Sequence, residues 1–444
     1  MVVDLSDVVI VDYVRTGIGY KSGALSGIRS DTMVIELLKQ LRDRNRPIKD
    51  NLEELAKDYR VDSIWGCNSQ IGTSSLTMGR TAALAAHFPI DVPGMSLNRQ
   101  CASGMTSLSL AIGEIKCGYF DIVFAGGMEQ QTVYPIGADL DWVDRNGKPR
   151  RDFPHPEIAK NPYIKDPFEP EKQGVMEGQI PGAEKIGHLN DADRETLDKF
   201  SLWSHEKAAK FNDLRHEEIV PIPVPYVGEL LDDPNQTVES KTGARASSRK
   251  GAITLMKADN DFRKFDEVKE KMGLGGKFED NLKFFDWKID EGVRTKGTME
   301  SMSKMRPIFR KVKIRGEKKR GLLTAGNSCP ENDGASGMLV MKREVAEQFG
   351  LKPLAHFKSI VTVGSDVVLM LTGPQLATKE LLKRTGYKLD DFEVIEVNEA
   401  FSTVVDAFCK DVDLDLFDER LNPWGGAIAV GHPTGSTGCR LIGT

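Results

Sequence analysis

Cysteine is scarce in this sequence, and its distribution excludes two kinds of protein. Six cysteines occur among 444 residues, and no two of them have the Cys-x-x-Cys spacing of a zinc or redox motif. Scattered thiols in a long chain are typical of a reducing compartment, whereas small secreted scaffolds carry paired cysteines. We therefore expect free thiols, no disulfide framework, no metal site and a cytoplasmic location.

Long apolar runs and an excess of positive charge are also missing. No apolar run approaches the ~20 residues that cross a membrane, and the net charge of −6 argues against a general nucleic-acid binder. The first lysine or arginine is Arg15, so the N-terminus is predicted to be the first strand and not a signal or transit peptide. A chain of 444 residues is long enough for two or three domains, and its 40% of hydrophobic residues is typical of a globular protein.

Strand and helix patterns alternate in the first third of the chain. A β-branched run at 8–14 predicts a strand buried on both faces. The segment 30–44 repeats apolar residues at helical spacing, which predicts an amphipathic helix. Further strands are predicted at 61–68 and 121–127, and further helices at 78–88 and 104–118. This alternation predicts a layered α/β domain.

The middle of the chain has a different composition. From 134 to 320 it is rich in charged residues, proline and glycine, and it is too long for a loop, so we predict an inserted domain. Its clearest helix is 193–211, and its stretch 257–292 is predicted to be a charged surface elaboration. Residues 1–133 form the predicted first half, which 321–348 completes.

A second alternating half is predicted at 349–444. Strands are expected at 356–364 and 392–398, and the glycine-rich segment 425–443 is expected to run from strand through turn to helix. Helices are expected at 373–386 and after residue 401. In both halves a strand delivers a reactive residue just ahead of a small-residue helix start, which indicates a weak internal duplication.

Cys101 stands in NRQCASGMTS, where an extended approach meets the start of a helix pattern. A thiol at such a junction lies near free backbone N–H groups and the positive end of the helix dipole, which lower its pKa. The small residues after it leave room for an acyl group. Taken alone, however, a buried and inert cysteine is the better interpretation.

Two later motifs supply further candidates. Asn398 and Glu399 in EVIEVNEAFS are predicted at the C-terminal edge of a strand, where ligands of α/β proteins bind, although a helix N-cap explains them equally well. His432 in GGAIAVGHPTGSTG follows a glycine and precedes a proline, so a rigid turn presents its ring. A lone histidine is more often structural, but this glycine density is unusual among the seven histidines.

Six motifs in order resemble the successive signatures of the thiolase family, the acetyl-CoA acyltransferases: VVIVDYVRTGIG, NRQCASGMTSLSLAI, AGGMEQQT, LLTAGNSCPENDGASG, EVNEAFS and GGAIAVGHPTGSTGCR. The resemblance implies an α/β fold of five layers, αβαβα, with two related halves and an inserted loop domain that binds CoA. It also implies CoA-dependent cleavage of 3-ketoacyl-CoA to acetyl-CoA and a shortened acyl-CoA. The reverse Claisen condensation, such as that of two acetyl-CoA to acetoacetyl-CoA, uses the same site.

The resemblance also assigns roles. Cys101 corresponds to the nucleophile that accepts the acyl group, His432 to the base that also contacts the oxyanion, and Asn398 to the holder of an oxyanion water. The implied substrate-binding residues are Ser328, Cys329, Phe401, Trp424 and Gly431. No metal or redox cofactor is implied, since CoA and acyl-CoA are the substrates, and members form homodimers or homotetramers.

The sequence departs from the family pattern in two places. Members continue past the histidine motif and end in a Cys-x-Gly motif, whose cysteine acts as acid and base. Cys439 lacks that context, so either the chain is truncated or the protein lacks the acid/base cysteine. As written, the second half would leave apolar surface uncovered, and we therefore expect the natural product to continue for a few dozen residues beyond Thr444. Cys329 stands where members often have a serine. Trp424, with GPQLATKELL and HPTGSTGCRL, makes the second half resemble the β-subunits of fatty-acid oxidation complexes, although those often carry His where this chain has Asn398. Chain length, direction and a partner subunit therefore stay open.

Two alternatives to a thiolase remain at this stage. The first is a decarboxylating or aldol-type condensing enzyme of the same fold. Such an enzyme would show two histidines or a Glu/His set around the cysteine, which NEAF with a single downstream GHP does not provide. A scaffold or lipid-carrier subunit without catalysis conflicts with the presence of Cys101, Asn398 and His432. Finally, the basic run 310–320 is predicted to be a solvated hairpin, the alternative being a contact with CoA phosphate.

Overall fold

The structure is a computed structural model. It describes residues 4–138, 142–143, 149–150, 156–212, 217–226, 237–239, 245–247, 283–314 and 316–444. Most of the charged surface elaboration predicted at 257–292 therefore lies outside the described residues.

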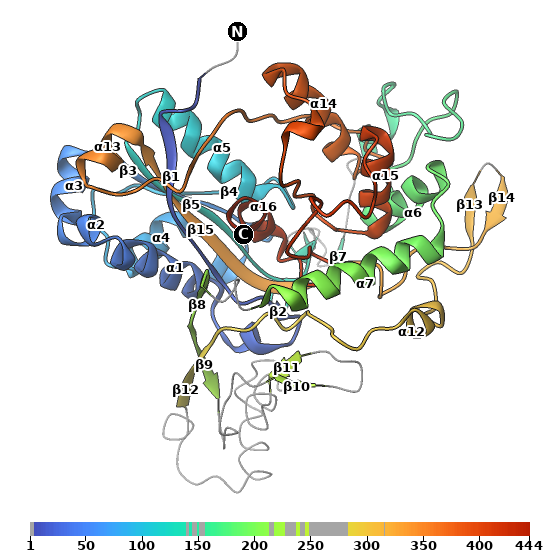
Figure 1. The fold of residues 1–444 in the computed structure, drawn as a ribbon, viewed down its shortest axis with the longest axis horizontal. Helices are drawn as coiled ribbons and strands as arrows, with labels where there is room; N and C mark the ends of the chain where they lie inside the picture. The colour runs from blue at the N-terminus through green and yellow to red at the C-terminus, as the bar shows by residue number, and fades with distance from the viewer. Residues whose placement is uncertain are drawn as a thin grey trace, which may run out of the picture.

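A mixed β-sheet forms the centre of the fold (Figure 1). Its strands follow the order β16 (Ala355–His356), β1 (Val8–Thr16), β15 (Asn332–Lys342), β5 (Ile122–Gln130), β3 (Val61–Gly66) and β4 (Met95–Leu97). β15 runs antiparallel to β1 and β5, whereas β3 runs parallel to β5 and β4. Two short strands join it, β2 (Gly19–Tyr20) on β15 and β8 (Ile219–Val220) on β1. β1, β3 and β5 are buried along their whole length, which explains their continuous apolar sequence.

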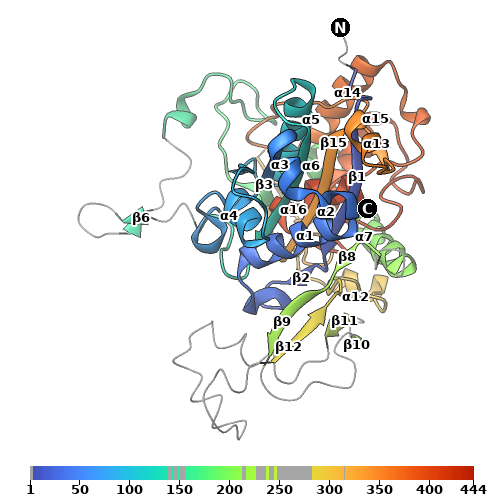
Figure 2. The same cartoon turned by 90° about the vertical axis from the view of Figure 1, so that its left-hand side faces the viewer.

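Helices cover both faces of this sheet. On one face lie α1 (Ser30–Arg44), α2 (Arg46–Asp50), α3 (Leu52–Asp58) and α4 (Met78–Ala85), which Figure 2 shows in front of the strands. The apolar side of α1 packs there against Trp65 and Phe124. On the other face lie α5 (Ser103–Lys116) and α16 (Thr434–Gly443), whose residues share a core with Ile10, Ile64 and Ala125. The strands and helices predicted for the first third are thus confirmed.

The last helix of the chain packs inside the N-terminal half. α16 contacts α5, β5 and β15, and the chain ends at the centre of the molecule in Figure 1. Glycine permits this close approach, because a Cβ on Gly104 would lie 2.7 Å from the carbonyl oxygen of Gly435 and one on Gly127 would overlap the same atom. The last helix of the second half is therefore part of the core of the first half.

The inserted region is tied to the sheet by a buried ion pair. Arg15 of β1 makes two hydrogen bonds of 2.8 and 2.9 Å with the carboxylate of Asp290, and it also pairs with Glu218. The main helices of this region are α6 (Gln179–Leu189) and α7 (Arg194–Lys210), and Asp193 caps α7 by accepting from the Thr196 N–H at 2.8 Å. Its other elements are α12 (Met299–Ser303), β6 (Trp142–Val143), β7 (Pro149–Arg150), β9 (Ile222–Tyr226), β10 (Thr237–Glu239), β11 (Arg245–Ser247), β12 (Lys283–Trp287), β13 (Val312–Ile314) and β14 (Glu317–Lys319).

The helices predicted for the second half are confirmed, but its strands are not. α14 (Gly373–Thr385) and α15 (Ser402–Val412) form as predicted, and α15 packs against α6 and α7. A further short helix, α13 (Arg343–Gln348), ends the segment 321–348 that completes the first half. The predictions of regular strands at 356–364, 392–398 and the start of 425–443 are wrong, since only β16 and a bridge between Ile395 and Leu421 occur there.

The reason is the lack of a ladder partner within the described chain. The Asn422 side chain takes the place of a neighbouring strand, because it accepts from the N–H of Val397 at 2.7 Å and donates to its carbonyl at 2.9 Å. The backbone N–H groups of Ala429 and Val430 donate to Gly426 within tight turns. An apolar, β-branched composition is therefore not sufficient for a strand in these segments.

Candidate active site

A tight turn presents Cys101 between β4 and α5. Gln100 has a left-handed backbone with φ of 51°, and the turn is locked by the hydroxyl of Ser103. That hydroxyl accepts from the N–H of Arg99 at 2.8 Å and donates to the carbonyl of Gln100 at 2.7 Å. The half-buried Cys101 therefore has a fixed position just before the helix.

The environment of the Cys101 thiol opposes ionisation. Burial raises the pKa of Cys101 to about 11, and the nearby carboxylate of Glu129 adds to this rise. The amide of Gln179, whose Nε2 lies 3.9 Å from the Cys101 sulfur, acts in the opposite direction. The lowered pKa predicted from the helix start is therefore wrong in direction, because the loss of water outweighs the helix dipole.

Hydrogen bonds fix the orientation and tautomer of His432. Its backbone N–H donates to Asn332 at 2.9 Å, and Gly431 before it has a left-handed φ of 118°. Nδ1 lies 2.7 Å from the hydroxyl of Thr437, which itself donates to the Pro433 carbonyl at 3.0 Å. Since that hydroxyl proton is already used, Nδ1 carries the ring proton and donates to Thr437. Nε2 is left as an unprotonated base.

His432 is neutral at physiological pH. Burial, helped by the positive charge of Arg440, lowers the pKa of His432 to about 3. A neutral imidazole and a neutral thiol therefore coexist in the resting site, so a stable thiolate–imidazolium pair is absent there.

Asn398 faces the base nitrogen of His432. Its Nδ2 lies 3.4 Å from Nε2 of His432, and its buried Oδ1 has no hydrogen-bond partner among the described residues. The N-cap alternative is wrong, because α15 begins at Ser402 and Phe401 is its N-cap residue. Glu399 is instead buried and accepts from Ser204, Asn422 and the N–H of Ile428, at 2.7, 2.8 and 3.1 Å.

The segment 328–331 lies beside the segments that carry Asn398 and His432. The Cys329 N–H donates to the Ala400 carbonyl at 3.1 Å, Ser328 bridges to Phe401, and Glu331 bridges to His432. Burial raises the pKa of Cys329, and the neighbouring Cys101 raises it further. The structure thus brings together Cys101, Asn398, His432 and four of the predicted substrate-binding residues, Ser328, Cys329, Phe401 and Gly431.

Trp424 is the fifth predicted substrate-binding residue, and the loop that contains it packs against Glu399. Its neighbour Asn422 donates to the Glu399 carboxylate, and Gly425 packs against Ala208 of α7. A role of Trp424 in substrate binding stays a prediction.

Two residues of the site were not identified from the sequence. Glu129 is buried, and its carboxylate accepts from the N–H groups of Asn68, Ser69 and Gly435 and the hydroxyl of Thr434, at 2.9 to 3.1 Å, and from the thiol of Cys67 at 3.9 Å. Gln179 comes from the inserted region. The motif AGGMEQQT contains Glu129, so an acidic residue inside an otherwise buried strand was the available signal. No signal marked Gln179.

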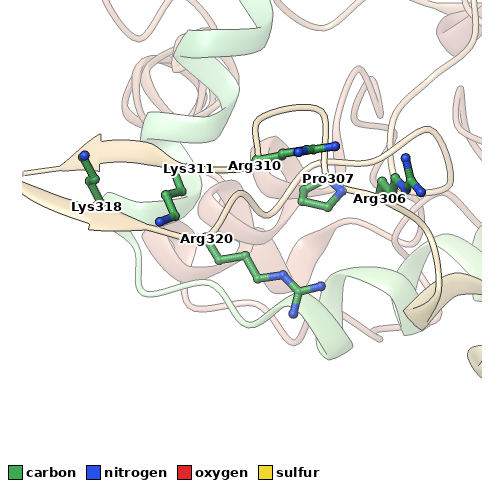
Figure 3. Close-up of a pocket in the computed structure, with 6 residues that line it drawn as sticks. All are labelled: Arg306, Pro307, Arg310, Lys311, Lys318 and Arg320. Atoms are coloured by element: carbon green, nitrogen blue, oxygen red, sulfur yellow. The ribbon is translucent and has the colours of Figure 1, made fainter.

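The basic run forms the predicted solvated hairpin, β13 and β14. Gly316 has a left-handed φ of 81° in its turn, and its charged side chains are exposed. Beside it is a hollow of about 620 Å³, and Figure 3 shows the charged ends around this hollow pointing in different directions. Its lining residues are Arg306, Pro307, Arg310, Lys311, Lys318 and Arg320.

Three further features concern the described chain as a whole. All six cysteines are free, as expected. Over the described ranges, no group of three or more His, Cys, Asp or Glu side chains is arranged to hold a metal ion. In the same part of the chain, none of the helices has the length and apolar character needed to cross a membrane.

Two family patterns match the chain. The one described as thiolase, N-terminal domain, matches residues 8–258 and 276–344, and the one described as thiolase, C-terminal domain, matches residues 351–444. The chain is 31% identical over 442 residues to a 3-ketoacyl-CoA thiolase of Aeromonas hydrophila, with 99% of this chain and 92% of that protein covered. It is 32% identical over 440 residues to that of Psychrobacter cryohalolentis, with 99% and 90% covered.

Solved structures share the fold. The dimeric peroxisomal thiolase of Saccharomyces cerevisiae superimposes with a TM-score of 0.71 at 28% identity, over 99% of this chain and 90% of that one. The acetyl-CoA acetyltransferase of Bacillus anthracis gives a TM-score of 0.70 at 26% identity, over 99% and 91%.

Proposed function

The chain belongs to the thiolase family and is an acyltransferase, and we propose that it transfers acyl groups to CoA through an acyl–Cys101 intermediate. In the degradative direction it cleaves 3-ketoacyl-CoA to acetyl-CoA and a shortened acyl-CoA. In the reverse direction it condenses two acyl-CoA molecules, for example two acetyl-CoA to acetoacetyl-CoA. CoA thioesters are the substrates, and this chemistry needs no further cofactor.

The first half-reaction forms the intermediate. As the Cys101 sulfur attacks the 3-keto carbon, its proton passes to Nε2 of His432. The bond between C2 and C3 then breaks, acetyl-CoA leaves as a carbanion, and the proton on His432 neutralises it. Because the pKa of Cys101 is about 11 and that of His432 about 3, the neutral pair is stable until the S–C bond forms.

The second half-reaction resolves the thioester. His432 accepts the proton of the CoA thiol, the CoA sulfur attacks the acyl carbon, and Cys101 leaves and regains its proton from His432. Stabilisation of the charge that develops on the acyl oxygen in both halves is assigned to the amide of Asn398 and to the imidazole of His432, whose Nδ2 and Nε2 lie 3.4 Å apart.

The observation that carries this proposal is the state of His432. Thr437 holds the proton on Nδ1, which leaves Nε2 as the base beside Asn398 and on the segment next to Cys329. A scaffold without catalysis would not need a buried, unprotonated histidine nitrogen beside the amide of Asn398.

Trapping the intermediate tests the proposal. After incubation with acetyl-CoA and rapid acid quenching, we expect mass spectrometry to find an acetyl group on the peptide that contains Cys101. Cys101→Ser abolishes this adduct and thiolysis of acetoacetyl-CoA. Cys117→Ser, at an exposed cysteine, is the matched control and retains both. An acetylated Cys101→Ser variant, or wild-type turnover without acyl–Cys101, would refute the mechanism.

Two finer points belong to the same proposal. We propose a homodimer, supported by the description of the yeast relative as dimeric, and light scattering of the purified protein tests it. We also propose a reducing compartment such as the cytoplasm, which is supported by six free thiols and tested by cell fractionation.

A further inference from the structure

We infer that Gln179 is a catalytic residue, whose side-chain amide donates a hydrogen bond to the Cys101 sulfur and stabilises the thiolate as it forms. The inference rests on the proposed function, in which that sulfur is the nucleophile. It gives the inserted region a direct part in the chemistry, since Gln179 is the first residue of α6.

Gln179 provides the side-chain hydrogen bond to this sulfur within the described chain. Its Nε2 lies 3.9 Å from Sγ, within the range of a hydrogen bond to sulfur. The other titratable groups around the thiol disfavour a negative charge or are neutral. Glu129 raises the pKa of Cys101, Cys329 couples to Cys101 in the same sense, and the ring proton of His432 is held by Thr437.

The helix that carries Gln179 has a fixed position. Glu184, one turn further along α6, accepts from the backbone N–H groups of Leu322 and Leu323 at 2.6 and 3.1 Å. Gly182 lies against the backbone of Leu369, where a Cβ would overlap the carbonyl oxygen. The amide is thus presented from an anchored element and not from a mobile loop.

The N-terminus of α6 acts in the same direction. Its first turn has no side-chain cap, so its backbone N–H groups and the positive end of its dipole lie at the residue that contacts the sulfur. In the attack, the S–H bond breaks, the proton goes to His432, and the contact from Gln179 strengthens as charge grows on sulfur.

Alkylation of Cys101 by iodoacetamide at pH 8 measures this effect. Below the thiol pKa, the rate is proportional to the thiolate fraction, so the ratio of two rates reports the difference in pKa. Gln179→Met keeps the length and removes the donor, and we expect the rate to fall about fivefold. Gln179→Glu adds a negative charge and slows the reaction more than tenfold, whereas Gln179→Lys accelerates it about fivefold.

Peptide mapping by mass spectrometry isolates the signal of Cys101 from the other five cysteines. Gln348→Met, at an exposed position of α13, is the matched control and leaves the rate unchanged. A merely structural role would slow the reaction in all three variants, or in none. The order Lys, Gln, Met, Glu from fast to slow supports the inference, and any other order overturns it.

The outcomes separate the inference from the proposed function. If acyl–Cys101 accumulates in wild type and the order is absent, only the role of Gln179 fails. If the order holds but neither acyl–Cys101 nor thiolysis is found, the proposed function fails and the contact between Gln179 and the thiol stands. The comparison of wild type with Gln179→Met tests the donor, and either charged variant tests the proximity of the side chain to the sulfur. Thermal melting by circular dichroism shows which of the variants are folded.

Discussion

Glu129 joins the two halves of the protein through a single carboxylate. It lies on β5 of the first half and accepts from Thr434 and Gly435, which follow His432 directly. Its partners Asn68 and Ser69 belong to the segment after β3. The turn that holds the histidine therefore depends on a residue 305 positions away in the chain.

Glu129→Gln should damage both stability and catalysis. The amide replaces an acceptor oxygen by an NH₂ group that faces backbone or hydroxyl donors, which should cost about 2–3 kcal/mol of unfolding free energy. The shifted turn moves His432, so we expect kcat to fall more than tenfold with a small change in KM. Urea denaturation and steady-state thiolysis check this. Glu347→Gln on exposed α13 should change neither quantity. Unaltered stability in Glu129→Gln would contradict the assignment.

Cys101, Asn398 and His432 could be predicted as site residues from the sequence because each stands in a recognisable local motif. Glu129 and Gln179 could not be predicted, because their roles depend on contacts with residues far away in the chain and not on adjacent residues in the sequence. The pKa of Cys101 was predicted in the wrong direction for the same reason. A helix start is visible in sequence, whereas the extent of burial follows from segments that fold over it.

The contact between α5 and α16 shows how two elements share one site. α5 follows Cys101 and α16 follows His432, and the helices touch where Gly104 meets Gly435. Their packing therefore sets the separation between Cys101 and His432, the proposed nucleophile and base.

Gly104→Ala tests this packing. A Cβ there would lie 2.7 Å from the Gly435 carbonyl and 3.0 Å from the Cys439 nitrogen, so the helices must separate. We expect a loss of about 2–3 kcal/mol in unfolding free energy and at least a tenfold loss in the rate of acyl-enzyme formation.

Gly113→Ala on the same helix is the matched control. Nothing lies within 4 Å of a Cβ at Gly113, so alanine should stabilise α5 by about 0.5–1 kcal/mol through its helix propensity. Urea denaturation compares the two variants, and equal effects would show that helix propensity and not packing decides both.

The elements themselves were predictable to different degrees. Helices such as α1, α7 and α14 have a local apolar period and were located correctly. The segment 392–398 has an equally clear β-branched run, but a strand also needs a partner elsewhere in the chain. The side chain of Asn422, which substitutes for that partner at Val397, has no signature in sequence.

The molecule as a whole buries neutral histidines, and this makes its stability depend on pH. Burial, followed by the positive charge of Arg294, lowers the pKa of His205 to about 4. His432 is shifted in the same direction. Between the folded pKa and the ordinary value of 6.5, the unfolded chain binds a proton that the native state does not. Stability therefore falls as the pH falls through this window.

We expect His205 to cost about 2 kcal/mol of unfolding free energy between pH 7 and pH 5, since each unit below 6.5 costs about 1.4 kcal/mol. In His205→Asn, the side-chain oxygen can replace Nδ1 as acceptor for the Arg294 N–H without taking up a proton. Urea denaturation at both pH values should show a loss that is smaller by that amount in the variant. An equal loss in both proteins would mean that His205 is protonated in the native state.

The neutral thiol of the resting site has a consequence for survival under oxidative stress. At pH 7 a thiol with a pKa near 11 is ionised in about one molecule in ten thousand, and peroxides oxidise the thiolate and not the thiol. In the absence of substrate, we therefore expect peroxide to oxidise Cys101 slowly.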